Sequence, residues 1–197
     1  MKLARTTTAI AAAALFTLVP LAAQADNLVH TDAIGDVQAA TVDENGDPTS
    51  DPVTVPDRTI GDITKVRTEH NATNVRVEMY FRALPKAGSI NDHEFRFVTN
   101  ELERDVSIVA GTGHWAGVAT MYKMDGNEYP CKTLKFFIDY PNKRVILNVP
   151  RSCLSYPKFV KFGAGFAAIS GNKIWIDDSR TTAGNGDDLA LSPGVFR

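Results

Sequence analysis

Residues 75–82 of the chain read VRVEMYFR, and apolar and polar side chains alternate along the whole stretch. Val75, Val77, Met79 and Phe81 fall on one side, and charged or polar residues fall on the other. Successive side chains of a strand point to opposite faces, so this two-residue period predicts a strand with one buried and one solvated face. The stretch decides the fold class, because almost no helical periodicity occurs after Ala25.

Shorter runs of the same kind recur along the chain and are separated by turn sequences rich in Gly, Asn, Asp and Pro. The runs lie at 94–99, 105–110, 115–123, 133–140, 143–149, 158–162, 166–169 and 173–176. Eight or nine short strands with closely spaced turns predict an all-β protein, an antiparallel two-sheet β-sandwich of jelly-roll type with only minor helix.

The segment 36–57 differs from these runs. It is acidic, rich in Pro, Thr and Gly, and has hardly any large apolar side chain. We expect a long surface loop there. A linker between domains is not expected, because strand-like sequence resumes directly after the segment.

Residues 1–25 have the layout of a Sec-type signal peptide. Lys2 and Arg5 are followed by an uncharged run rich in Ala and Leu at 9–23 and by the tripeptide AQA at 23–25. A membrane anchor is the alternative interpretation, but the apolar run at 9–23 is short and contains Pro20, whereas a spanning helix needs about 20 residues. We therefore predict cleavage after the tripeptide and a secreted, extracellular product without a transmembrane segment.

Removal of the signal peptide would leave residues 26–197, which we interpret as a single domain with an acidic balance. Without Lys2 and Arg5, 19 basic residues remain against 23 acidic ones, a formal charge of −4 with histidine neutral. Binding to nucleic-acid phosphates requires a basic excess gathered on one face, so a nucleic-acid partner is not expected. A chain of this length buries about two-thirds of its unfolded surface, which is enough for one core.

Two cysteines, Cys131 and Cys153, occur in a chain that is expected to leave the reducing cytosol. The strand runs on either side of Pro141-Asn142 would form a hairpin, and folding about that turn places Cys131 within one residue of the position opposite Cys153. A disulfide is the default interpretation for an exported protein. The alternative, reactive thiols or a metal pair, finds no further Cys or suitably spaced His to complete a zinc set.

Aspartates in the expected loops are the basis for a predicted calcium site, because calcium requires hard oxygen ligands. The segment DENGD at 43–47 matches the opening of an EF-hand loop, but Pro48 and Thr54 stand where the motif needs Gly and Glu. A site assembled from separate loops stays open, and the competing interpretation is that these residues cap turns and keep the surface soluble. The candidate ligands are Asp32, Asp36, Asp62, Asp178 and Asp187.

A short echo links two of these aspartates. Residues 34–37 read IGDV and residues 60–63 read IGDI. Four similar residues do not make a repeat, so chance is the simpler interpretation and two related strand starts are the alternative.

Aromatic residues are candidates for a glycan-binding face, because sugar rings stack on flat aromatic surfaces. We select Trp115, Tyr122 and Trp175 as candidate ligand-binding residues. Trp115 follows the loop-like stretch GTGH at 111–114. Trp175 lies between Ile174 and Ile176, and strand alternation places its side chain on the opposite face from theirs. Packing in the core is the competing interpretation for each of them.

No sequence motif identifies a catalytic residue. His93-Glu94 begins like a zinc-protease helix, but Phe97 occupies the second His position, and no Gly-x-Ser-x-Gly elbow occurs. A triad or a carboxylate pair assembled from distant loops stays open, because these sites are defined by geometry. His93 and His114 are the candidates for such an alternative.

Two stretches carry a resemblance to known proteins. The segment DAIGD at 32–36, followed by GDIT at 61–64, resembles small secreted bacterial β-sandwich proteins, which are similar to family-nine carbohydrate-binding modules and DOMON-type domains. The segment RSCL at 151–154 before PKFV at 157–160 resembles the second-cysteine segment of such proteins. The resemblance implies a structural calcium held by loop aspartates near the start of the domain and one sandwich face that takes the ligand. No paired-tryptophan sugar clamp is found.

The leading hypothesis is a secreted, non-enzymatic β-sandwich that binds a glycan, a cell-wall component or a protein partner and is stabilised by calcium. The first alternative is a small secreted hydrolase that uses loop carboxylates or a histidine. The second is a structural or inhibitory secreted protein that displays the 36–57 segment.

Overall fold

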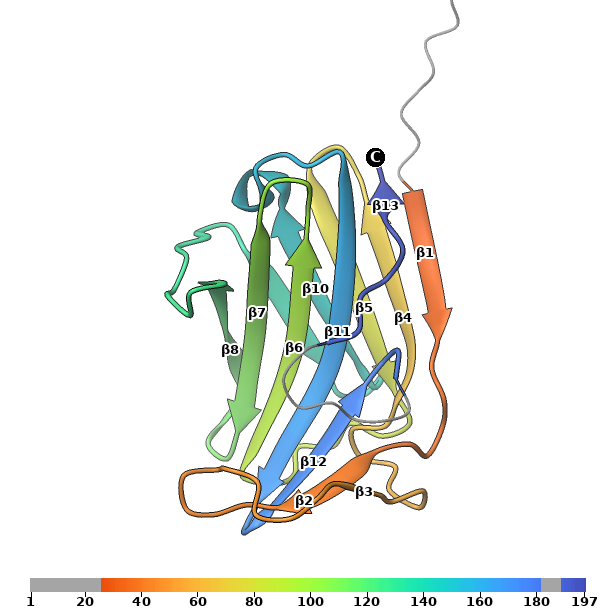
Figure 1. Cartoon of the computed structure of the whole chain (residues 1–197), viewed down its shortest axis with the longest axis vertical. Helices are drawn as coiled ribbons and strands as arrows, with labels where there is room; N and C mark the ends of the chain where they lie inside the picture. Colours follow the sequence, from red (N-terminus) through yellow and green to blue (C-terminus); the bar gives the residue numbers. More distant parts are fainter. Residues whose placement is uncertain (1–25, 182–188) are drawn as a thin grey trace, which may run out of the picture.

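The computed structural model describes residues 26–181 and 189–197, which fold into two antiparallel β-sheets packed face to face (Figure 1). The strands are β1 (Asp26–Thr31), β2 (Gln38–Thr41), β3 (Val53–Thr54), β4 (Ile63–His70), β5 (Asn74–Phe81), β6 (Ile90–Val98), β7 (Glu103–Gly111), β8 (His114–Lys123), β9 (Lys135–Asp139), β10 (Arg144–Pro150), β11 (Phe159–Ser170), β12 (Lys173–Asp178) and β13 (Val195–Phe196). The smaller sheet has the order β1-β4-β5-β10-β9 and the larger β3-β2-β12-β11-β6-β7-β8, with β13 paired to β11.

This arrangement confirms the predicted all-β, antiparallel two-sheet class. The expected minor helix is the short 3-10 turn η1 (Arg151–Leu154), and the described ranges contain no other helix. The predicted signal peptide lies outside the described residues.

Strand β5 lies in the middle of the smaller sheet and shows the alternation that its sequence predicts. Val75, Val77 and Met79 are fully buried, whereas Arg76 and Tyr80 lie on the opposite, partly exposed face. The buried face of the larger sheet is mainly aromatic, and its largest buried side chains are Phe95, Phe97, Phe162 and Phe166. Fully burying one such side chain contributes about 1.5–3 kcal/mol, so the core layer between the two sheets contributes strongly to stability.

The two runs predicted at 158–162 and 166–169 belong to one twelve-residue strand, β11. Gly163 and Gly165 interrupt the alternation in the sequence, but both lie inside the strand. A Cβ at Gly163 would stand 2.6 Å from Cβ of Leu189, and one at Gly165 would stand 2.5 Å from its Cδ2. The glycines therefore make room for Leu189, which packs across the outer face of β11.

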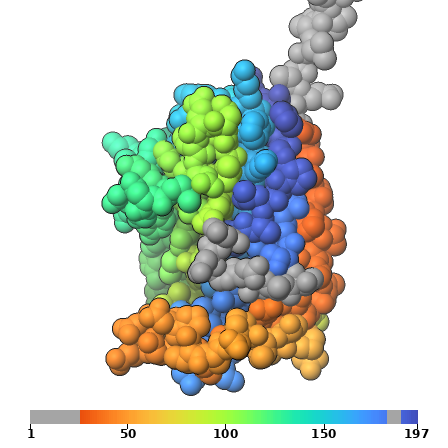
Figure 2. Space-filling view, viewed as in Figure 1, coloured from red at the N-terminus to blue at the C-terminus, as the bar shows by residue number. Residues whose placement is uncertain are grey.

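The expectation of one long surface loop at 36–57 is wrong in part. Strands β2 and β3 lie in this segment and extend the larger sheet beyond β12. Figure 2 shows the segment, in orange, covering the lower end of the sandwich. Its strand signal is weak because the apolar residues that it buries are few and small: Val37, Ala40 and Val42.

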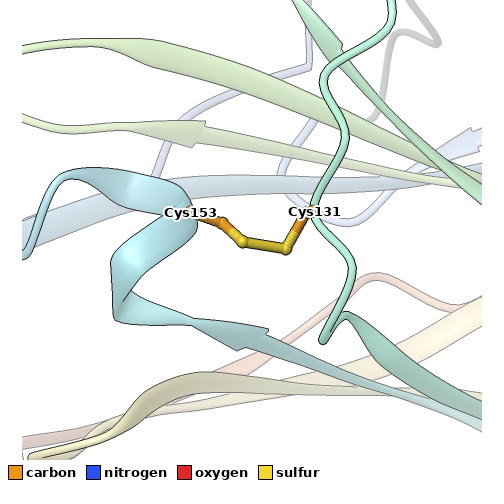
Figure 3. The surroundings of a disulfide bond; sticks show 2 residues. All are labelled: Cys131 and Cys153. Carbon is orange, nitrogen blue, oxygen red and sulfur yellow. A yellow bond between two sulfur atoms is a disulfide. The ribbon is translucent and has the colours of Figure 1, made fainter.

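The predicted disulfide and hairpin are both confirmed. Cys131 and Cys153 are bonded, with their Cα atoms 5.8 Å apart. β9 and β10 pair antiparallel, with Arg144 opposite Asp139. Figure 3 shows the bond joining the segment before β9 to the helical turn after β10. The crosslink therefore ties the open end of the hairpin.

His93 lies in the middle of the core. Its ring centroid is 5.7 Å from that of Phe81 and 5.3 Å from that of Phe166. The side chain is completely buried, and neither ring nitrogen has a hydrogen-bond partner among the described residues. Burial lowers the pKa of this imidazole from 6.5 to about 3, because the charged form has no solvation there.

We predict that replacing His93 makes the protein more resistant to acid. Because the folded-state pKa lies below the unfolded value, the contribution of the neutral ring is present above pH 6.5 and is lost as the pH falls toward 3. The stability advantage of His93→Phe over the parent is the difference between their free energies of unfolding. It should increase by about 1.4 kcal/mol for each unit by which the pH falls from 6.5 toward 3. Urea denaturation at several pH values measures it.

The matched control is His114→Phe, because His114 is an exposed histidine in the hairpin between β7 and β8. This variant should keep the parent's pH dependence. An equal pH dependence in the parent and in His93→Phe would contradict the prediction.

Candidate functional site

Three aspartates from distant parts of the chain meet at one place. Asp32 follows β1, Asp36 precedes β2 and Asp177 lies near the end of β12. One carboxylate oxygen from each lies within 4.8 Å of the others. This spacing suits a shared cation, because Ca²⁺ takes oxygen ligands at about 2.3–2.6 Å. The charge of Asp62 acts on all three, and we call the four residues the acidic cluster.

The oxygens of the acidic cluster have few hydrogen-bond partners for their burial. Asp62 is completely buried, and its Oδ2 accepts hydrogen bonds from the backbone N–H of Gly35 at 2.9 Å and from Arg82 at 2.8 Å. Asp62 Oδ1, Asp32 Oδ2 and both oxygens of Asp36 have no partner among the described residues. Buried polar atoms are nearly always bonded to protein, water or an ion, so this donor set fits a hard cation.

The electrostatics of the acidic cluster agree with this geometry. Burial raises the pKa of Asp32 to about 7 and that of Asp177 to about 8, and repulsion from the neighbouring carboxylates adds to both shifts. The pKa of Asp36 is also raised, again mainly by burial. Shared protons or a bound cation would relieve the repulsion.

The two echoed Ile-Gly-Asp segments place their aspartates by the same local conformation. Gly35 and Gly61 each have a φ of +82°, in the left-handed region that favours glycine. Each is followed by an aspartate of the acidic cluster and then by a fully buried aliphatic residue. At Gly61 a Cβ would lie 2.1 Å from Cε1 of Phe166, so no larger residue fits. The echo therefore corresponds to a shared structural device.

The predicted metal ligands are only partly brought together. Asp32 and Asp36 belong to the three-oxygen group and Asp62 lies beside it. Asp178 is committed elsewhere, since its two oxygens accept hydrogen bonds from the backbone N–H groups of Arg180 and Ala190. Asp187 lies outside the described residues.

Asp177, which completes the group, was not among the predicted ligands. Strand alternation in the sequence could have identified it, because Asp177 falls on the same side of β12 as Trp175. In the structure this side faces the core, and Asp177 lies opposite the buried Phe166 of β11. Asp178 points to the other face of the strand.

A groove of about 330 Å³ lies on the outer face of the larger sheet. Its floor comes from β6, β7, β11 and β12, and Tyr122 of β8 and Leu189 also line it. Glu94 stands in the middle of the floor, with Ser107 opposite on β7 and Gly165 opposite on β11. Asp177 lines the groove through its backbone, because its carbonyl oxygen lies 3.2 Å from the position that a Cβ of Gly165 would take, whereas its side chain points to the core-facing side of β12.

The groove carries more negative than positive charge. Arg96 donates from Nε to Asp105 at 2.9 Å, which offsets part of the negative charge of that carboxylate. Glu94 has no hydrogen-bond or ion-pair partner among the described residues, and its side chain reaches solvent in the groove. Partial desolvation by the surrounding groove atoms, together with repulsion from Asp92 and Asp105, raises its pKa to about 7. Asp92 accepts a hydrogen bond from the hydroxyl of Ser107 at 2.7 Å.

The three candidate aromatic residues do not share one surface. Tyr122 is half-buried and lines the groove. Trp115 packs edge-to-face on Tyr140, whose hydroxyl donates to the Trp115 carbonyl oxygen at 2.8 Å. Trp175 lies under Arg58, with the guanidinium carbon 3.9 Å from the ring centroid.

Neither candidate catalytic histidine lies at the groove or the acidic cluster. His93 is enclosed in the core, and His114 is exposed beside the turn between β7 and β8. In the part of the chain that the structure describes, the polar side chains of the groove are carboxylates, Arg96, Ser107 and Tyr122.

No protein-family model, curated protein or solved structure matches this chain. The similarity to family-nine carbohydrate-binding modules and DOMON-type domains therefore stays a prediction from the two short stretches. Within the described ranges, no helix has the length and apolar character needed to cross a membrane.

We predict that, with a chelator present, the protein becomes less stable as the pH rises from about 6.5 to 8.5. The folded-state pKa values of Asp32 and Asp177 lie above 3.8, so their contribution is full below pH 3.8 and is lost as the pH rises through about 7 and 8. The free energy of unfolding should fall by roughly 1–3 kcal/mol over this window. Urea denaturation at constant ionic strength measures it.

Asp177→Asn should flatten much of this profile, whereas Asp51→Asn, at an exposed position, should leave it as it is. A parent protein whose stability does not change across the window would show that these carboxyl groups are not perturbed.

Proposed function

We propose that the chain is an exported, non-enzymatic β-sandwich that binds a glycan in the groove on its larger sheet and is stabilised by calcium at the acidic cluster. The groove carries this proposal: it is a concave surface with an aromatic side chain, an uncommitted carboxylate and hydroxyl groups. Ligand sites combine apolar walls and a few placed polar groups in this way.

The position of the groove favours a sugar over an extended peptide. Strands β6, β7 and β11 each have neighbours on both sides, so their backbone groups are committed to the sheet. A ligand must therefore be recognised by side chains, and added-strand pairing is not available there. The Tyr122 ring can stack on the apolar face of a sugar, while Ser107 and Glu94 can bond its hydroxyl groups.

Export is supported by two independent features. Residues 1–25 have the signal-peptide layout described above, and the disulfide between Cys131 and Cys153 is typical of an oxidising compartment. A chain kept in the cytosol would hold these thiols reduced.

Calcium is supported by the unpartnered oxygens of the acidic cluster. Asp32, Asp36 and Asp177 would supply carboxylate ligands, and the negative charge of the neighbouring Asp62 would add to the attraction for a cation. Calcium accepts six to eight such oxygens in flexible geometry, and neighbouring backbone carbonyls or water complete such a shell.

One observation favours a second function, glycoside hydrolysis. The pKa of Glu94 is raised to about 7, while Asp105 is paired with Arg96 in the same groove. Such hydrolases use two carboxyl groups at one site, of which the one with the raised pKa acts as the general acid.

We predict that Tyr122→Ala weakens glycan binding at least tenfold, because it removes the stacking surface of the groove. A glycan array on the mature protein would identify a ligand, and calorimetry would measure the dissociation constants of parent and variant. The matched control is Tyr156→Ala, because Tyr156 is 67% exposed and lies outside the groove.

Two results would contradict the groove proposal: absence of binding to every glycan tested, or equal losses in both tyrosine variants. Release of reducing ends by the parent protein but not by Glu94→Gln would replace binding by hydrolysis as the function.

We expect millimolar calcium to raise the melting temperature over that in chelator by about 5–10 °C, because a ligand at 100 times its dissociation constant stabilises by about 2.7 kcal/mol. Asp36→Asn should lose most of this shift, and Asp51→Asn should keep it. An equal melting temperature of the parent in calcium and in chelator would contradict the proposal that the acidic cluster binds calcium.

A further inference from the structure

A second, smaller cavity of about 160 Å³ lies at one end of the sandwich. It is lined by residues before β4, by the connection between β5 and β6, and by the ends of β11 and β12. The residues that matter here are Arg58, Gly88, Ala168 and Trp175. The cavity shares no residue with the groove or the acidic cluster.

Arg58 brings a positive charge to this cavity. Its guanidinium carbon lies 3.9 Å from the ring centroid of Trp175, and its Nε donates to the carbonyl oxygen of Ile60 at 3.1 Å. Partial burial lowers the pKa of Arg58, and no carboxylate pairs with it among the described residues. In a chain with an acidic excess, a half-buried arginine without an acidic partner has its terminal N–H groups available for a ligand.

Asn91 lies directly behind the lining of the cavity. It is 1% exposed, and neither Oδ1 nor Nδ2 has a hydrogen-bond partner among the described residues. The side chain lies directly against two lining residues: its Oδ1 is 3.6 Å from the position that a Cβ of Gly88 would take, and it pairs across the sheet with Ala168. Asn91 does not itself line the cavity, and because Gly88 has no side chain, only the backbone of that residue stands between the amide and the cavity.

These groups define the chemistry of the ligand. A guanidinium recognises a planar carboxylate through two parallel N–H bonds. A buried amide with a free donor and a free acceptor is satisfied by a hydroxyl group, which can accept and donate at once. The cavity admits one ring or one acid group, because it is smaller than the pockets that hold drug-sized ligands.

We propose that this cavity binds a hydroxylated carboxylate, the chemistry of a uronic-acid residue. Arg58 holds the carboxylate, Asn91 bonds a hydroxyl group, and the Trp175 ring keeps the guanidinium in place by cation–π contact. This proposal does not depend on the groove, because the two sites share no residue. A variant that abolishes binding in the groove should therefore leave binding in the cavity unchanged.

Trp175 provides a direct readout, because the chain has two tryptophans and Trp115→Phe leaves Trp175 as the only one. Titration of this background with methyl glucuronide should give a saturable change in tryptophan emission. Methyl glucoside, which lacks the charge, and acetate, which lacks the hydroxyl groups, should each bind at least tenfold more weakly.

Arg58→Gln should abolish the emission change, and Arg58→Lys, which keeps the charge but not the fork, should weaken binding about tenfold. Asn91→Leu should weaken methyl glucuronide binding but not acetate binding. Two variants serve as controls: Arg67→Gln, which changes an arginine that is paired with Glu69 on the smaller sheet, and Tyr122→Ala in the groove. Both should bind methyl glucuronide with the affinity of the Trp115→Phe background.

The proposal is overturned if methyl glucuronide gives no saturable change at millimolar concentration, if acetate binds as tightly, or if both Arg58 variants keep the background affinity. Calorimetry on the same proteins checks any variant whose tryptophan emission is altered before ligand is added.

Discussion

The packing of the apolar face of β5 against the phenylalanines of β6 and β11 holds the two sheets together, and both regions of functional interest depend on it. Phe166 is the clearest link. Its ring lies against Phe81 and His93 in the core and leaves no room for a side chain at Gly61. The residue after Gly61 is Asp62, so core packing sets the position of one member of the acidic cluster.

Strand β12 connects the acidic cluster to the groove. Its alternation directs Asp177 toward the cluster and Asp178 toward the backbone of the C-terminal segment. The two adjacent carboxylates therefore have different surroundings. Asp177 lies among mutually repelling carboxylates, and Asp178 holds the backbone of Ala190 beside the groove. The pKa values of both buried acids are raised, and perturbed titratable groups cluster at functional sites, which makes this strand end a candidate site.

Much of the fold could be predicted from the sequence, because two-residue alternation directly reports a strand with one buried face. The 75–82 stretch and the disulfide hairpin belong to this class. The alternation does not report a strand where the packed residues are small, as at Gly163 in β11 and Ala40 in β2. In such places the structure depends on partners far away in the chain, which a local pattern does not contain.

The sites were harder to predict for the same reason. Four of the five selected aspartates lie in the described residues, and three of those gather at the acidic cluster, because loop aspartates beside glycines are easily recognised. Tyr122 of the groove was selected from the sequence, but Asp177 was not, and neither were the charged groove residues Glu94 and Asp105, which look like ordinary solvated strand residues until the sheet is assembled. The stacking of Arg58 on Trp175 also joins segments that no sequence spacing relates.

The docking of Leu189 over the glycines of β11 has a consequence for the order of events during synthesis. Leu189 and Ser192, which exchanges hydrogen bonds with Phe162, follow β12 in the chain and are therefore made after the strands that they cover. The wall of the groove is thus absent until this segment has emerged, and a nascent chain has no finished pocket. The proposed ligand of the groove would therefore meet a finished site only on molecules whose larger sheet is already complete.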